Sequence, residues 1–549
     1  MSFLSSLKPN KPKRTSFDLS HEVKLTTDFG KLVPFFVQDV IPGDTFKVSV
    51  ETLVRFAPMI APIMHRVNVY THFFFVPYRL VWDEWREFIT GGEDGTAEPV
   101  FPRCHIEKSE GNQTSGIVWP LFIGPSTLTD YMGFPYNFGE VTVMPAMNID
   151  INLLPFRAYQ LIYNEYYRDQ NLQDEVDFSK SSGIFEAQYM NGRPDVDGCL
   201  ECLYLRTRCW EKDYFTSALP FPQRLSNPVS VPVNGYVDIE ADRRAAIRNP
   251  SFYRMINGAP GTGSPLYTNN SGEIYNSSDT NAPLFYDPSG SLVGKFSDNT
   301  GVTVNELRRA FSLQRWLENN ARAGSRYIEQ IFSHFGVRSS DARLQRPEYL
   351  GGGKSPVVIS EVMQTSETAN SPQGNVAGAG VSYGTSHSFK RFFEEHGIVL
   401  GILSIMPRSA YQNGIPRLFA KFDKFDYYFP EFAHLGEQEV KQYELYCDSS
   451  QPLDASYNNK VFGYLPRYAE YRYVNSHVHG YFRTSMNFWH MGRNLTPNAG
   501  LNSEFVTCNH APLDRIFAVE DEYVDHLWVQ MYVKFYALRP LPKYGTPGL

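Results

Sequence analysis

The residue types that most often carry chemistry occur here in two short patterns. His477 and His479 are separated by one residue, so on a strand both rings would lie on the same face, as the first ligands of some metal sites do. The carboxylate that would complete such a site is absent from residues 480–487. Cys199 and Cys202 form a Cys-x-x-Cys pair, but the second cysteine or histidine pair of a zinc site is missing. We therefore expect ordinary histidines and cysteines and no bound metal.

A glycine-rich loop at 351–355, with the sequence GGGKS, has the composition of a phosphate-binding loop. The first glycine of that motif is replaced by Glu348, and Pro356 would break the helix that must follow. Nucleophile elbows, HExxH helices and dinucleotide-binding glycine patterns are also absent from the sequence. The sequence therefore predicts a protein that is not an enzyme and that uses no cofactor.

The composition is that of a large folded chain with a modest negative charge. Of the 549 residues, 42% are apolar and 15% are aromatic, which supplies ample core and excludes wholesale disorder. The net charge of −8 confines any nucleic-acid contact to local patches. Six scattered cysteines are not a disulfide framework, and the N-terminus has no secretory signal. The longest apolar run, 397–406, is about half the length of a membrane span. We expect a soluble protein from a reducing compartment, with no membrane insertion.

The segments that could hold functional side chains in place begin with three β-like runs between residues 29 and 78. These runs are 31–40, 44–56 and 65–76, and the second alternates apolar with polar residues. So small a β-unit is not stable alone, and its apolar face needs partners. The strongest alternating run downstream is 526–538, HLWVQMYVKFYAL. We expect it to close one β-unit by joining the opening strands in a sheet.

Other elements are predicted between these ends. Helical spacing occurs at 80–89, 153–171 and 302–336, the last with a bend near Ala323 and Gly324. Further strands are expected at 203–208, 229–239, 398–405, 461–465 and 471–482. The polar, glycine-rich stretches 91–150, 249–300 and 351–384 are predicted to be long loops.

The first 16 residues form a basic arm. Lys8, Lys11, Lys13 and Arg14 occur with no acidic residue before Asp18. A solvated flexible tail is the common meaning of such a composition. The alternative is an arm that contacts phosphates, because each Lys or Arg displaces a counterion from nucleic acid.

A second basic region spans residues 302–346, which contain eight arginines and only four acidic residues. Such a run favours a solvated face or one that bridges subunits, with nucleic-acid contact as the minority interpretation. Arg suits bidentate pairs across an interface better than Lys does. Five of these arginines are therefore predicted to lie at a subunit interface: Arg308, Arg309, Arg315, Arg322 and Arg326.

Residues 249–300 differ in composition from the rest of the chain. Gly, Ser, Asn, Thr, Asp and Pro dominate, with isolated aromatic residues. Loops of this length are usually functional or disordered. We predict a surface projection that holds little core, in which a receptor-facing group comprises Tyr267, Asn269, Asn270, Tyr275 and Asn276.

Four long segments together resemble the major capsid protein of the microviruses, small phages with single-stranded DNA, and specifically its gokushovirus branch. They are spread in order over most of the chain: 17–46, 153–171, 212–223 and 321–353. The resemblance is weakest in 249–300 and 351–384. It implies an eight-stranded viral jelly roll, an antiparallel β-sandwich with helical insertions and long inter-strand loops. A flexible arm (1–16) would precede a single jelly-roll domain (17–549) that includes the Arg-rich helical segment (302–350).

The resemblance also implies a biological role. Family members assemble into a T=1 icosahedral shell around circular single-stranded DNA, and a variable insertion projects near the three-fold axes. The expected partners are further copies of the chain, an internal scaffolding protein, a DNA pilot protein, the genome and a host surface receptor. The expected location is the virion, after synthesis in the bacterial host cytoplasm.

A second hypothesis remains open from the residues alone. The abundance of Tyr, Trp and Asn also suits a β-rich carbohydrate-binding protein or a glycan-active enzyme. A glycosidase needs two carboxylates at a defined separation, and the sequence nominates no such pair. Sedimentation would separate the hypotheses, because a glycan-cleaving monomer would form no shell-sized species.

Overall fold

The computed structural model describes residues 12–107, 124–134, 148–186, 199–224, 303–363, 376–497, 499–519 and 524–544, together with the backbone of short strands between 237 and 296. The chain divides into two compact units. The larger comprises Met1–Arg224 and Glu318–Leu549, and the smaller comprises Leu225–Leu317.

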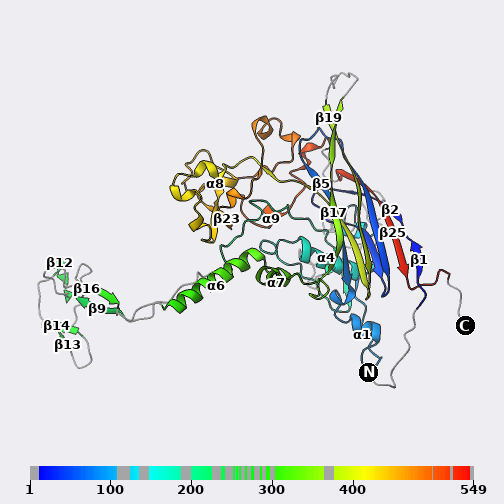
Figure 1. Cartoon of the computed structure of the whole chain (residues 1–549), viewed down its shortest axis with the longest axis horizontal. Coiled ribbons are helices and arrows are strands. Elements are labelled where there is room, and N and C mark those ends of the chain that lie inside the picture. Colours follow the sequence, from blue (N-terminus) through cyan, green and yellow to red (C-terminus); the bar gives the residue numbers. More distant parts are fainter. Residues whose placement is uncertain are drawn as a thin grey trace. The chain divides into compact units, whose positions relative to one another are not determined.

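A six-stranded antiparallel sheet forms one layer of the larger unit (Figure 1). Its order is β1-β25-β4-β19-β18, and β2 also pairs with β25. The strands are β1 (Thr15–Asp18), β2 (His21–Thr27), β4 (Thr45–Phe56), β18 (Val358–Met363), β19 (Val376–Phe392) and β25 (Leu527–Arg539). Along β25 every second residue from Leu527 to Ala537 is buried, because alternate side chains of a strand point to opposite faces.

The second layer is a four-stranded antiparallel sheet in the order β17-β5-β20-β3. Its strands are β3 (Val33–Val40), β5 (Val67–Pro77), β17 (Glu348–Pro356) and β20 (Gly397–Pro407). One hydrophobic core lies between the two sheets and contains residues of both, including Phe36, Phe73, Val399 and Phe535. The rings of Phe36 and Phe535 meet edge to face across it, with centroids 5.2 Å apart.

The strand order confirms the expected jelly-roll class of β-sandwich. Four strands of one sheet, β2-β25-β4-β19, face the four strands β3-β20-β5-β17, while β1 and β18 lengthen the first sheet. The three opening strands and the closing strand are confirmed. The last strand pairs with β4, and on its other side with β1 and β2, which the sequence patterns did not predict. Because β1 begins at Thr15, residues 15 and 16 belong to the sheet and not to a flexible arm.

Two long insertions carry most of the remaining elements. The first connects β5 with β17, and the second connects β20 with β25. The described elements of the first, within the larger unit, include α1 (Trp85–Thr90), α3 (Leu128–Tyr131), α4 (Leu154–Ile162), α5 (Cys199–Leu203), α7 (Tyr327–Phe335) and the small sheet β7-β6-β8 (Asn148–Asn152, Arg103–Glu107, Ile184–Glu186). The second includes β22 (Glu437–Lys441), α8 (Gln442–Leu445), β23 (Val461–Pro466) and α9 (Ser503–Val506).

Helix α4 covers the outer face of the four-stranded sheet. Pro155 lies in its first turn, where a missing N–H is tolerated, and a π-helical turn (Tyr163–Tyr167) continues it. Phe156 and Ile162 of this helix belong to one apolar cluster with Phe74 of β5 and Leu400 of β20. Strand β20 is consequently buried on both faces along its whole length.

The predicted break in the Arg-rich segment is confirmed. Helix α6 (Val304–Ala323) ends before Gly324, whose φ of +101° lies in the region that favours glycine, and α7 follows. One predicted loop and two predicted strands are wrong. The stretch 351–384, expected to be a loop, contains the end of β17, all of β18 and the first part of β19. Leu203 ends α5, and the next residues form only isolated bridges. In 471–482 only β24 (Ser476–His477) is extended, since 3-10 turns flank it and Gly480 has a φ of +67°.

In the part of the smaller unit that the structure describes, the strands form four antiparallel pairs. They are β9 (Val237–Ala241) with β16 (Leu292–Phe296), β10 (Phe252–Tyr253) with β15 (Phe285–Tyr286), β11 (Met255–Ile256) with β12 (Ala259–Pro260), and β13 (Leu266–Thr268) with β14 (Ile274–Asn276). Among the residues that the structure describes, no helix in either unit is long and apolar enough to cross a membrane.

Candidate interaction surfaces

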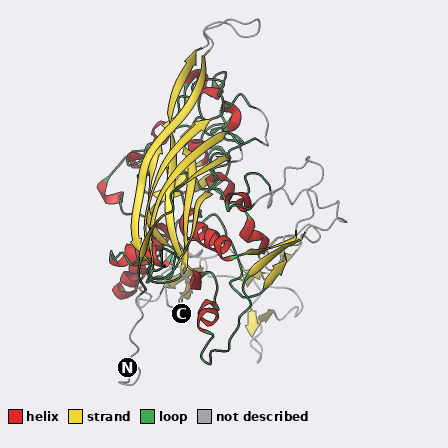
Figure 2. Cartoon of the chain, turned by 90° about the vertical axis from the view of Figure 1, so that its right-hand side faces the viewer, coloured by secondary structure: helices red, strands yellow, loops and turns green. Residues whose placement is uncertain are grey.

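The outer face of the six-stranded sheet carries a row of aromatic side chains. Trp528, Tyr532 and Tyr536 recur at every fourth residue of β25 and therefore share one face. All three are exposed, with Trp528 retaining 45% of its accessible surface. Figure 2 views the molecule from the side on which this sheet lies in front. We call this surface the outer sheet face.

Cations flank the aromatic row on the neighbouring strands. In the sheet register Arg55 of β4 lies opposite Trp528, and Lys47 of β4 lies opposite Tyr536. Lys390 of β19 continues the line beyond Lys47, and all three cations are exposed. These are the residue types that hold planar and anionic ligands against a sheet.

A hollow of about 830 Å³ lies at the β2 edge of the outer sheet face. Trp528 and Arg55 line it together with Lys24 and Gln530, and Tyr131 of α3 forms part of its far wall. The Tyr131 hydroxyl donates a 2.7 Å hydrogen bond to the Thr26 carbonyl, which fixes this wall to β2.

A second surface, the aromatic tract, comprises residues 418–435 of the second insertion. Eight large apolar side chains in it are exposed, and Phe422 retains 83% of its surface. Three short 3-10 helices shape the tract (Arg417–Ala420, Lys424–Asp426 and Pro430–Phe432). The Lys421 ammonium lies 4.1 Å from the centroid of the Tyr471 ring and 3.1 Å from a Glu470 carboxylate oxygen. These contacts anchor the tract to the segment that contains Glu470 and Tyr471. A contiguous apolar surface of this kind marks a protein–protein contact.

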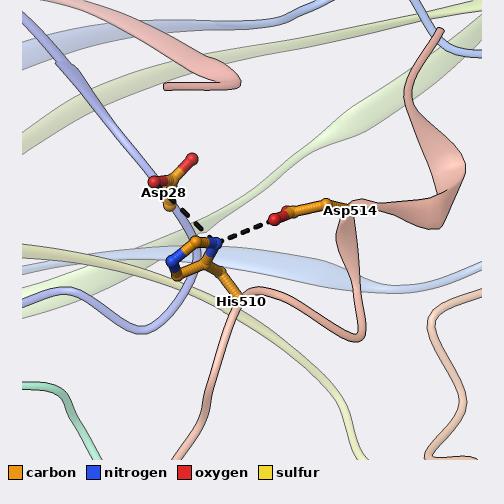
Figure 3. Close-up of side chains that lie close together, drawn as sticks. All are labelled: Asp28, His510 and Asp514. Carbon is orange, nitrogen blue, oxygen red and sulfur yellow. Dashed lines mark hydrogen bonds and ion pairs between the residues drawn. The ribbon is translucent and has the colours of Figure 1, made fainter. Parts of the chain in front are cut away.

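An acid–histidine cluster lies where the two sheets join (Figure 3). His510 Nδ1 is 2.8 Å from an Asp514 carboxylate oxygen and 3.9 Å from Asp28 Oδ2. Asp28 is buried between β2 and β3, and it accepts a 3.0 Å hydrogen bond from the backbone N–H of His526. The other carboxylate oxygen, Asp28 Oδ2, accepts a 2.7 Å hydrogen bond from the Lys31 ammonium.

The charges in this cluster compensate one another. Burial alone would raise the pKa of Asp28, but Lys31, the His526 N–H and His510 together lower it to about 2. The hydrogen bond to Asp514 raises the pKa of His510. Asp28, His510 and Asp514 are the one grouping within the described residues whose ligand atoms are close enough for a metal ion. Because Lys31 already places a positive charge on Asp28, we interpret the group as an ion-pair network between the sheets.

Another hollow, about 1170 Å³, lies between β5 and the α6–α7 junction. Three of the arginines that line it make contacts within the chain. Arg326 donates to the carbonyls of Asn164 and Arg168, and Arg346 pairs with Glu165 and Asp341. Arg322 binds Glu437, whose side chain is 1% exposed. These contacts hold the α6–α7 junction against the larger unit's own insertion.

Comparison with known proteins shows where this chain belongs. The family model described as "Capsid protein (F protein)" matches residues 5–549. The chain is 36% identical to the capsid protein VP1 of Chlamydia phage 1, with 98% of this chain and 96% of the relative covered. It is 34% identical to the capsid protein VP1 of Bdellovibrio phage phiMH2K, covering 97% and 95%. It is 29% identical to that of Spiroplasma virus 4, covering 99% and 97%.

The chain belongs to the capsid protein (F protein) family. The expected resemblance to gokushovirus-like major capsid proteins is thereby confirmed. The chain is a structural component of a virus particle and not an enzyme.

The structure places some of the predicted site residues of this capsid protein. Lys13 and Arg14 are exposed, and the Arg14 guanidinium lies 5.1 Å from the Phe392 ring centroid. Lys8 and Lys11 lie outside the described residues, as do Asn269 and Asn270. Tyr267 lies in β13, and Tyr275 and Asn276 lie in β14, where the structure describes the backbone but not these side chains.

The five predicted interface arginines fall into two groups. Arg308, Arg309 and Arg315 are exposed on α6, and their interface role stays a prediction. Arg322 and Arg326 make the intramolecular contacts described above. His477 and His479 have ring centroids 5.9 Å apart, on a segment that is mostly not a strand.

Sequence reasoning missed the outer sheet face, the aromatic tract and the acid–histidine cluster. The signal for the outer sheet face was present, because Trp528, Tyr532 and Tyr536 alternate with buried residues in a run already predicted to be a strand. The acid–histidine cluster left no signal, since Asp28 and His510 are far apart in the sequence and meet only through the fold.

Proposed function

We propose that this capsid protein assembles with further copies of itself into a T=1 icosahedral shell that encloses circular single-stranded DNA. The observation that carries the proposal is the aromatic tract on a folded jelly roll. So many exposed Phe, Tyr and Leu side chains need a protein partner, and in a shell built from one chain that partner is another copy. Lys421 is buried and pairs with Glu470, so the tract is held in place on its own chain and presents its exposed rings as a fixed surface.

The test replaces one residue at the centre of the tract. Phe422→Asp should leave a folded chain, because the native side chain is largely exposed, and should abolish shell-sized particles because a charge would be buried between copies. Phe422→Leu is the matched control and should still assemble. Negative-stain microscopy and sedimentation in the presence of the internal scaffolding protein provide the measurement. Normal shells from Phe422→Asp would contradict the proposal.

The remaining roles follow from the same proposal. The shell would form with an internal scaffolding protein, would incorporate a DNA pilot protein, and would be made in the bacterial host cytoplasm before residing in the virion. Residues 249–300 would project and contact a host surface receptor. The separate compact unit Leu225–Leu317 supports this role, because it is largely self-contained. Deletion of 249–300 should leave assembly intact and impair attachment to host cells.

A further inference from the structure

We propose that the outer sheet face binds the packaged single-stranded DNA, with bases stacked on the aromatic row and phosphates held by the flanking cations. The inference rests on the proposed enclosure of a single-stranded genome and assigns that contact to particular residues. The residues are Trp528, Tyr532 and Tyr536 for the bases and Arg55, Lys47 and Lys390 for the phosphates.

The first argument is the exposure of the aromatic row. On the four-stranded sheet, the outward Phe74 is 1% exposed because α4 and its neighbours cover it. On the six-stranded sheet, Trp528, Tyr532 and Tyr536 all remain accessible. Figure 2 shows the strands of this side in front of the described helices. A protein that keeps three large aromatic rings in water on one strand presents a surface ready for a planar ligand.

The spacing of the row fits a chain of bases. Residues four apart on a strand are about 13 Å apart, so each ring can stack on a different base of one extended strand. Stacking tolerates any base, because every base has a π-face. A packaged genome presents every sequence to the same surface, and this mode of binding meets that requirement.

The charges favour an anion. Arg55, Lys47 and Lys390 are exposed beside the row, while the nearby Glu51 is paired with Lys534. Two further acids adjoin the row: Glu22 of β2 lies opposite Tyr532 and 3.8 Å from Lys24, and Asp18 of β1 lies opposite Tyr536. The face thus carries five cations (Lys24, Lys47, Arg55, Lys390 and Lys534) against three acids (Asp18, Glu22 and Glu51), so it is locally cationic although the chain carries a net charge of −8. Such a patch attracts phosphates and releases their counterions.

Two further features agree with this occupant. The hollow lined by Trp528 and Arg55 is large enough for a flipped-out base, with Gln530 and Lys24 as hydrogen-bonding groups at its wall. At the opposite end of the sheet, Arg14 lies over Phe392, which is exposed on β19. The basic N-terminal segment thus enters the fold at the edge of the same surface.

The experiment measures binding of a fluorescently labelled oligothymidylate to the full-length chain by anisotropy at several salt concentrations. Replacing Trp528, Tyr532 and Tyr536 together with Ala should weaken binding about 100-fold or more, since each of the three stacked bases contributes about fivefold or more. The matched Phe replacements keep the rings and should restore binding. Replacing Arg55, Lys47 and Lys390 with Gln should lower the slope of log affinity against log salt by about two.

The control variant is Tyr481→Ala with Lys460→Gln, which removes an exposed ring and an exposed cation from the second insertion. It should bind as the native chain does. Affinity within twofold of native in the Ala variant would overturn the inference, as would equal losses in the control. If the Ala variant binds DNA normally but forms no shell, the outer sheet face is a contact between copies. A native chain that forms no shell would refute the proposed assembly, whatever its affinity for DNA.

Discussion

The outer faces of the two sheets differ in what lies against them. Phe74, Leu400 and Ile402 of the four-stranded sheet are buried beneath α4 and the chain around it. Trp528 and Tyr532 of the six-stranded sheet are comparably large, and they are exposed. Both faces belong to one sandwich with one core, so the difference arises from the connections and not from the strands.

The connections explain the asymmetry. The first long insertion begins after β5 and returns to β17, and both strands belong to the four-stranded sheet. The second insertion begins after β20 of the same sheet. Connections between strands are usually short, and here both long insertions begin at strands of the four-stranded sheet. The outer face of the four-stranded sheet is therefore buried within the chain, whereas the outer sheet face is accessible to a ligand.

The largest expected effect is a contrast in stability between the two faces. Phe74→Ala should lower the free energy of unfolding by about 3–5 kcal/mol, because it removes a buried ring and leaves a cavity under α4. Tyr532→Ala should lower it by only about 1 kcal/mol, because this side chain keeps 38% of its accessible surface. Urea unfolding of the unassembled chain, followed by fluorescence, provides both values. Equal losses from the two variants would mean that the outer sheet face is structural.

A smaller effect tests whether the covering layer belongs to the same folding unit. Arg157 of α4 is buried, and it donates to the carbonyls of Val81 and Ser181. Arg157→Met should cost about 2 kcal/mol, because the buried carbonyl of Val81 and the part-buried carbonyl of Ser181 lose their donor. Arg55→Met on the outer sheet face is the matched control and should cost about 0.5 kcal/mol at most. If Arg157→Met speeds hydrogen exchange only in α4 and leaves the global free energy of unfolding unchanged, then α4 and the chain around it unfold separately from the sandwich.

Several strands of the sandwich were predictable from their composition and period. Runs 44–56 and 526–538 follow the two-residue period of a strand with one buried face, 31–40 and 65–76 are rich in β-branched and aromatic residues, and all four are strands in the structure. By contrast, β17, β18 and β19 lie largely in 351–384, whose glycine-rich composition predicted a loop. The run 471–482 is equally rich in β-formers, yet it folds into turns. Its aromatic residues satisfy local contacts, such as Tyr471 against Lys421, and do not pair with a strand along their length.

The interaction surfaces were less predictable for a physical reason. Whether a residue such as Trp528 is covered depends on where the long insertions pack, and no local pattern encodes that placement. The arginines of 302–346 show the same limit. Arg322 and Arg315 are indistinguishable in sequence, but Arg322 meets the buried Glu437 through the fold while Arg315 is exposed.

The seam between the two sheets gives the smallest and most specific test. Asp28 and Lys31 lie in the connection from β2 to β3, and His526 directly precedes β25, so the acid–histidine cluster joins the layers. The pKa of Asp28 is lowered to about 2 in the folded chain, against an ordinary value of 3.8. A group with a lowered pKa contributes stability that is present above its unfolded value and is lost as the pH falls through its folded value.

Asp28 should therefore contribute about 2 kcal/mol above about pH 4, and the contribution should disappear between about pH 4 and 2. For His510 the sign is opposite. Its raised pKa contributes stability below about pH 6.5, which is lost as the pH rises through the folded value. The seam is thus strongest between about pH 4 and 6.5. Unfolding of the native chain and of Asp28→Asn across this range tests the assignment, because the difference between them should vanish near pH 2. A difference that stays constant with pH would show that Asp28 joins the two sheets through its hydrogen bonds and not through its charge.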